Sequence, residues 1–91
     1  MKLQTTIRKN GFVYNQIART ETTAIYEQTQ EGEIISYEVF KIQTTKKDYT
    51  FPNGTLIKSG TERFPSNEDF GKTAWSIRNL DRAKKRFSEL N

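Results

Sequence analysis

Cysteine and histidine are both absent from this sequence. Disulfides, thiolate nucleophiles, zinc sites built from cysteine and histidine, and Ser-His-Asp arrangements each need at least one of these side chains. All of them are therefore excluded, and only carboxylates, lysine, tyrosine or hydroxyl groups could support catalysis. We expect a protein that is not an enzyme and that holds no cofactor and no metal.

A long apolar run is also absent. No stretch approaches the about 20 apolar residues that a transmembrane helix needs. The chain has 91 residues, of which 33% are apolar and 29% charged, a composition typical of one small domain. We therefore expect a single domain over residues 1–91, located in the cytoplasm and without membrane contact. The lack of cysteine agrees with a reducing compartment.

Aromatic residues make up for the shortage of aliphatic ones. The sequence contains six phenylalanines, four tyrosines and one tryptophan. Because each ring buries a large apolar area, we expect a core built mainly from rings.

The first half of the chain has the pattern of β-strands, which begins after Gly11. The strongest segment is 33–45, where apolar residues alternate on both faces, as in a central strand. Segments 12–19 and 22–30 are weaker strand candidates, and Glu31-Gly32-Glu33 is a turn signal between strands. Residues 1–10 carry no such pattern, so we expect them to be flexible.

Residues 46–60 interrupt this pattern. Pro52-Asn53-Gly54 is a turn tripeptide with aromatic and aliphatic residues on either side. This composition predicts a loop or a small hairpin that protrudes from the domain.

Two interpretations fit the C-terminal third. Apolar residues from Phe70 to Leu90 recur every three or four positions, which is compatible with one long helix that begins at Ser66. We favour a short capped turn at 66–70, an extended segment at 72–77, and a helix capped by Asn79. The buried stripe of that helix would comprise Leu80, Ala83, Phe87 and Leu90. The predicted fold is α+β, an antiparallel β-meander of three or four strands with one C-terminal amphipathic helix packed on the sheet.

Gly71-Lys72-Thr73 repeats the last three letters of the phosphate-binding loop of nucleotide hydrolases. That loop also needs a glycine five residues before Gly71, where this chain has Ser66, and a buried strand ahead of it. Neither requirement is met, so we interpret Gly71 as a bend and Lys72 as a solvated side chain.

Glu68 and Asp69 form a pair of carboxylates that could hold a metal or act as acid and base. Adjacent residues on a turn usually diverge, however, and Ser66 precedes them as a helix cap would. We interpret the two acids as groups that complement the dipole of a short helix.

Three segments resemble a known group of proteins: "YEVF" at 37–40, "FPSNEDFGKTAW" at 64–75 and "NLDRAKKRFSEL" at 79–90. They are similar to a loose group of small proteins encoded by bacteria, phages and mobile elements. The group shares a Y-E-V-F strand, a P-S-N-E-D-F-G-x-x-A-W block and an L-x-x-A-x-x-x-F terminal helix. The resemblance implies an antiparallel sheet with one C-terminal helix, and it implies no activity and no functional residues. The shared letters fit an architectural role, with Phe70 and Trp75 as core anchors.

Charge is distributed unevenly around a net value of +4. Residues 20–40 carry five glutamates and no base, whereas residues 72–91 carry six bases and two acids. Such polarisation points to partners of opposite charge.

The bases of the C-terminal helix lie opposite its apolar stripe and could contact phosphates. We therefore expect a small non-catalytic accessory binding protein, encoded by a phage or a mobile element, that contacts nucleic acid through this basic helix face. The alternative is an inhibitor or modulator of a host defence protein that acts through an acidic strand face with Glu27, Glu31, Glu33 and Glu38. The candidate nucleic-acid-binding residues are Arg78, Arg82, Lys85, Arg86, Lys46 and Lys47.

Overall fold

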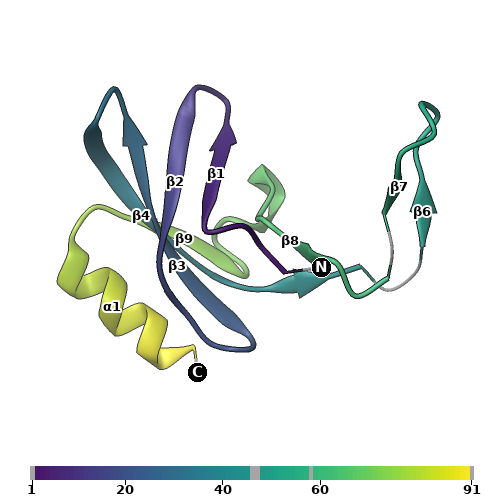
Figure 1. The fold of residues 1–91 in the computed structure, drawn as a ribbon. Coiled ribbons are helices and arrows are strands. Elements are labelled where there is room, and N and C mark those ends of the chain that lie inside the picture. The colour runs from purple at the N-terminus through teal and green to yellow at the C-terminus, as the bar shows by residue number, and fades with distance from the viewer. Residues whose placement is uncertain (1, 46–47, 58, 91) are drawn as a thin grey trace.

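The computed structural model describes residues 2–45, 48–57 and 59–90. Its centre is a five-stranded antiparallel sheet in the order β1-β2-β3-β4-β9. One helix, α1, lies on one face of the sheet (Figure 1). The predicted α+β meander with a C-terminal helix is confirmed. The bounds are β1 Thr6–Lys9, β2 Phe12–Arg19, β3 Thr23–Gln30, β4 Glu33–Lys41, β9 Ala74–Ile77 and α1 Leu80–Glu89.

The strand β1 precedes the point at which the sequence pattern begins. It pairs with β2 through a tight turn at Asn10 and Gly11, whose φ angles are 55° and 82°. Asn-Gly is the dipeptide that such a two-residue hairpin turn prefers, because both residues adopt positive φ at low cost. Residues 6–9 are therefore part of the sheet in this structure.

The face of the sheet under α1 holds a small core in which aliphatic residues predominate. Ile25, Tyr37 and Val39 lie buried there against Ala83 of the helix. The predicted helical stripe is confirmed, because the partly buried residues that complete this core are Ile77, Leu80, Phe87 and Leu90.

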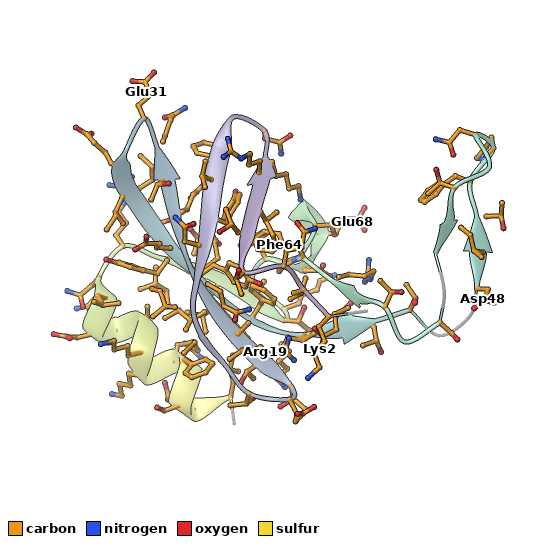
Figure 2. All side chains as sticks on the ribbon, viewed as in Figure 1. Lys2, Arg19, Glu31, Asp48, Phe64 and Glu68 are labelled. Atoms are coloured by element: carbon orange, nitrogen blue, oxygen red, sulfur yellow. The ribbon has the colours of Figure 1, made fainter. Side chains whose placement is uncertain are left out.

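The opposite face of the sheet, away from α1, holds an aromatic core. Phe64 lies among three rings, with centroids 4.8 Å from Tyr14, 5.5 Å from Tyr26 and 5.2 Å from Phe40. Figure 2 shows Phe64 pointing into the middle of the molecule. The loop that carries Phe64 thus closes this side of the sheet.

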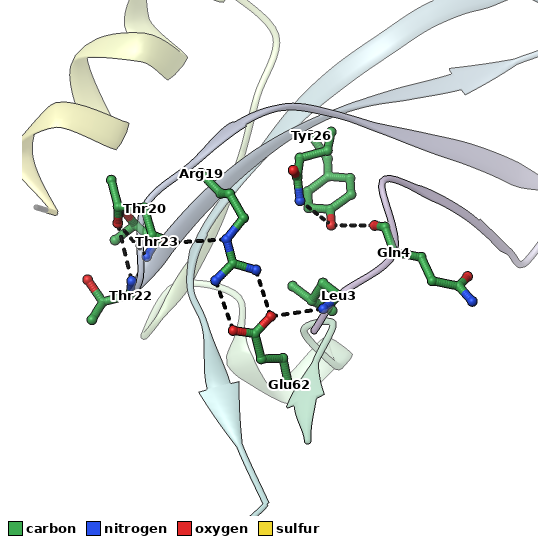
Figure 3. A network of polar contacts seen from close by, with 9 residues as sticks. Leu3, Gln4, Arg19, Thr20, Thr22, Thr23, Tyr26 and Glu62 are labelled. Atoms are coloured by element: carbon green, nitrogen blue, oxygen red, sulfur yellow. Dashed lines mark hydrogen bonds and ion pairs between the residues drawn. The ribbon is translucent and has the colours of Figure 1, made fainter. Parts of the chain in front are cut away.

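An ion pair ties that loop to the sheet and to the N-terminal segment (Figure 3). Arg19 donates from Nη1 and Nη2 to the two carboxylate oxygens of Glu62, at 2.6 and 2.8 Å. The backbone N–H of Leu3 donates to the same carboxylate at 2.8 Å. These donors, Arg19 first, lower the pKa of Glu62 to about 2.

Two short ribbons extend from the end of β4. The strand β5 (Gln43–Thr44) pairs with β8 (Glu62–Arg63), and β6 (Tyr49–Thr50) pairs with β7 (Leu56–Ile57). The β6–β7 ribbon stands away from the sheet, with Asp48 at its base (Figures 1 and 2). Pro52-Asn53-Gly54 lies at its tip.

The segment before α1 follows the interpretation of a turn, an extended stretch and a capped helix. A 3-10 turn spans Asn67–Asp69, β9 follows, and the side chain of Asn79 accepts from the N–H of Arg82 at 3.0 Å. A single long helix from Ser66 is therefore wrong.

Two expectations about buried residues are also wrong. Phe70 is 36% exposed and does not anchor the core. The two-faced apolar pattern of segment 33–45 would bury Ile34 and Ile35 on opposite faces of the strand. They are instead 53% and 39% exposed, at the point where a register shift opposite Gln28 and Thr29 interrupts the alternation of β4. No helix in the described part of the chain is long and apolar enough to cross a membrane.

Candidate nucleic-acid interface

The predicted basic residues gather on one helix and the turn before it. Arg82 and Lys85 project from α1 and are exposed, Arg86 is partly buried, and Arg78 is exposed just before the cap. Leu80, Ala83 and Phe87 occupy the sheet side of α1, which leaves the bases on its outer and lateral sides. We call Arg78, Arg82, Lys85 and Arg86 the basic surface.

None of these bases is neutralised by an acid. Within the ranges that the structure describes, the only ion pair is the one between Arg19 and Glu62. The helix itself carries Asp81 and Glu89, yet neither carboxylate lies within ion-pair distance of a base of the basic surface. The four bases of the basic surface are therefore not held in ion pairs, and they outnumber the two acids of α1.

Trp75 borders the basic surface. It lies on β9 opposite Val39, so its side chain is on the face that α1 covers. The guanidinium of Arg86 lies over the indole ring at 5.0 Å from the ring centroid, which is within cation–π range. Trp75 is only partly buried, so the core anchor predicted from the sequence is also a surface feature.

The sequence could not assign Trp75 to this surface. Its exposure depends on β9 being the last strand of the sheet, paired with β4 alone. Strand order is a property of the tertiary fold, and the pattern of residues 72–77 indicates only that the segment is extended.

Gly71-Lys72-Thr73 does not form a phosphate-binding loop. The N–H of Gly71 donates to Ala74 O, and those of Lys72 and Thr73 donate to Asp69 O, at 2.8 to 3.0 Å. Because these three donors are used within the turn, none is left to point at a phosphate. Gly71 has φ of 87°, which agrees with its interpretation as a bend, and Lys72 is exposed.

The carboxylates Glu68 and Asp69 have separate surroundings. Asp69 turns back to accept from the backbone N–H of Ser66 at 2.9 Å, as the third residue of a capping box does, while Glu68 is exposed. No cluster of three or more acidic residues that could hold a metal occurs among the described residues.

The acidic residues of segment 20–40 do not form one surface. Glu38 is buried on the aromatic face, whereas Glu27 lies on the helix face and accepts from Asn15 at 3.5 Å. Glu31 and Glu33 are exposed at the β3–β4 turn, and Figure 2 shows Glu31 at its tip. Tyr26 and Tyr37, which the sequence interleaves with these acids, are buried.

The two remaining candidates, Lys46 and Lys47, lie outside the described residues. The basic surface therefore consists of the four residues on and before α1, with Lys72 and Trp75 nearby on the β9 side. A comparison of the chain with protein-family models, with curated proteins and with solved structures finds no match in any of the three.

Proposed function

We propose that this chain is a non-catalytic accessory protein that binds nucleic acid through the basic surface. The observation that carries the proposal is that four bases lie on or just before α1, away from its apolar stripe, and that none of them is in an ion pair within the described residues. A cytoplasmic location and an origin in a phage or mobile element complete the proposal.

The physical basis is the release of counterions. Each base that neutralises a phosphate frees a cation condensed on the nucleic acid, so the affinity falls linearly with salt on a logarithmic scale. Four such contacts predict a slope of about −3 to −4. Because the bases are not engaged by acids within the protein, no internal ion pair must break before they bind.

The proposal is tested by measuring the fluorescence anisotropy of labelled oligonucleotides at several salt concentrations. We expect binding that weakens steeply with salt and that is abolished in the triple variant Arg82→Glu, Lys85→Glu and Arg86→Glu. The control reverses three exposed bases away from α1, Arg8, Lys41 and Arg63, and changes the net charge by the same amount. The control should retain most of the affinity.

Two results would count against the proposal. One is the absence of DNA or RNA binding at low salt. The other is an equal loss of affinity in the two triple variants, which would indicate a response to net charge alone.

The competing proposal is a modulator of a host protein that acts through the acidic residues of segment 20–40. It has less support, because Glu38, Tyr26 and Tyr37 are buried. Recovery of the same host protein from lysate with and without nuclease would favour it.

A further inference from the structure

Two planar groups meet at the border between α1 and β9. The guanidinium of Arg86 lies over the indole of Trp75, and both side chains remain partly accessible to solvent. Bases stack on tryptophan and on arginine planes alike, and such stacking does not depend on which base is present. This border therefore has the chemistry of a stacking platform.

Three further cations lie close to Trp75 or Arg86 along the chain. Arg82 lies one helical turn before Arg86 and projects from the same side of α1. Lys72 and Arg78 flank β9 at its two ends, and both are exposed. Their positions suit the phosphates of a strand that runs along β9.

The open edge of β9 adds a backbone donor. The N–H of Lys41 donates to Thr73 O. Because hydrogen-bonded and outward-facing residues alternate along an antiparallel strand, the backbone groups that point toward β4 are those of Thr73, Trp75 and Ile77. The backbone groups that point outward are those of Ala74 and Ser76. Ala74 O already accepts from Gly71. Ser76 is then the one residue of β9 whose outward N–H and C=O are both available. One free N–H suits a single phosphate contact, whereas a peptide that adds to the sheet as a strand needs several free backbone groups.

The geometry favours unpaired bases over a duplex. α1 lies along the sheet (Figure 1). Trp75 is partly buried on the face of the sheet that α1 covers, with the guanidinium of Arg86 over its ring. Bases inside a duplex are stacked on each other and cannot reach a partly buried ring, whereas bases of a single strand can turn toward it.

We propose that the basic surface binds single-stranded nucleic acid, with a base stacked on the Trp75–Arg86 pair and phosphates held by Lys72, Arg78 and Arg82. This inference rests on the proposed function, whose nucleic-acid partner it narrows to single strands.

The test uses Trp75 itself as the reporter, because it is the only tryptophan in the chain. The full-length protein is titrated at low salt with four probes: oligo-dT of about 12 nucleotides, a duplex of the same length, inorganic polyphosphate and oligo-glutamate. We expect oligo-dT to bind most tightly and to quench the tryptophan fluorescence. Polyphosphate should bind through charge without comparable quenching.

Variants then separate stacking from charge. By anisotropy, Trp75→Ala should bind labelled oligo-dT about 5- to 150-fold more weakly, with its affinity for polyphosphate unchanged. Trp75→Phe, which keeps a ring in the fold, should bind oligo-dT with intermediate affinity. Arg86→Lys keeps the charge and removes the guanidinium plane, so it should weaken oligo-dT binding. The matched change Arg8→Lys, at an exposed arginine on β1 outside the basic surface, should not.

The inference is overturned if the duplex binds as tightly as oligo-dT, or if Trp75→Phe and Arg86→Lys both bind oligo-dT like the wild type. It is also overturned if oligo-glutamate quenches Trp75 and binds as tightly, because the partner would then be an acidic peptide. Failure of the proposed function gives a different result, namely no binding of any nucleic acid.

Discussion

Glu38 is a carboxylic acid held among hydroxyl groups in the middle of the sheet. It is 4% exposed, and its Oε1 lies 3.2 Å from Ser36 Oγ and 3.1 Å from Ser76 Oγ. The two hydroxyls lie 3.1 Å from each other, and Ser36 also donates to Gln28 at 2.7 Å. Four close oxygen contacts thus share the hydrogens of only two hydroxyl groups.

A proton on Glu38 would supply the missing hydrogen. Burial raises the pKa of Glu38 above its ordinary value, and the bonds from Ser76 and Ser36 oppose this only in part. Its Oε2 is buried with no hydrogen-bond partner, which makes the ionised form more costly still. A group whose pKa is raised in the folded state stabilises the fold below its unfolded pKa, and this stability is lost as the pH rises through the folded value.

Glu38→Gln should remove the loss of stability that ionisation of Glu38 causes as the pH rises. The amide is neutral at every pH and brings its own hydrogens to Ser36 and Ser76, so we expect the variant to be more stable than the wild type at pH 8 by about 1 kcal/mol. Urea unfolding between pH 5 and pH 8 measures the difference, which should shrink toward the acidic end. The exposed Glu33→Gln is the control. A Glu38→Gln variant less stable than the wild type at pH 8 would show that Glu38 is stabilising as a carboxylate.

At the scale of elements, the position of the basic surface depends on how α1 begins. Asn79 has an extended backbone and accepts from the N–H of Arg82, which fixes the first turn of the helix. Arg82 itself belongs to the basic surface, so the same bond stabilises the helix and orients a candidate binding residue.

Asn79→Ala should cost about 1 kcal/mol in the free energy of unfolding, since one N–H of the first turn loses its acceptor. Oligonucleotide binding should weaken in parallel because Arg82 is less well ordered. Asn79→Asp keeps an acceptor, adds charge that suits the helix dipole, and should retain the stability. Thermal unfolding of the three proteins measures this, and equal stability of Asn79→Ala and wild type would contradict a capping role.

The elements themselves were predictable to different degrees. The alternation in 33–45 predicts β4, and the spacing of Leu80, Ala83, Phe87 and Leu90 predicts α1, because both patterns are local. The strand β1 was missed although Asn10-Gly11 is a strong hairpin signal, since the four residues before it include only one apolar side chain, Ile7.

Non-local packing limited what the sequence could predict about the core and the site. Phe64 and Phe70 lie in the same loop segment and have the same side chain, yet one fills the aromatic core and the other is exposed. Which ring turns inward depends on the ties between the loop and the sheet. The residues of the basic surface follow from helical periodicity, whereas the contact between Arg86 and Trp75 requires the strand order.

At the scale of the whole molecule, Glu62 joins three separated parts of the chain. Its carboxylate binds Arg19 of β2 and the backbone of Leu3, and β8 leads directly into the loop with Phe64. Because the side chains of Arg19 and Glu62 are only 18% and 10% exposed, the bidentate pair is well shielded from solvent. Loss of these interactions of Glu62 should weaken the packing of the Phe64 loop against the aromatic core.

Glu62→Gln should therefore destabilise the protein by about 2 kcal/mol at neutral pH, because it leaves Arg19 without its charge partner. The pH dependence gives a sharper test. The pKa of Glu62 is lowered from 4.5 to about 2, so its contribution is complete above pH 4.5 and is lost as the pH falls toward 2. We expect urea unfolding to show converging stabilities of wild type and Glu62→Gln over that interval. A constant difference down to pH 2 would mean that the ion pair is not what holds the loop, and that the amide fails for reasons of shape.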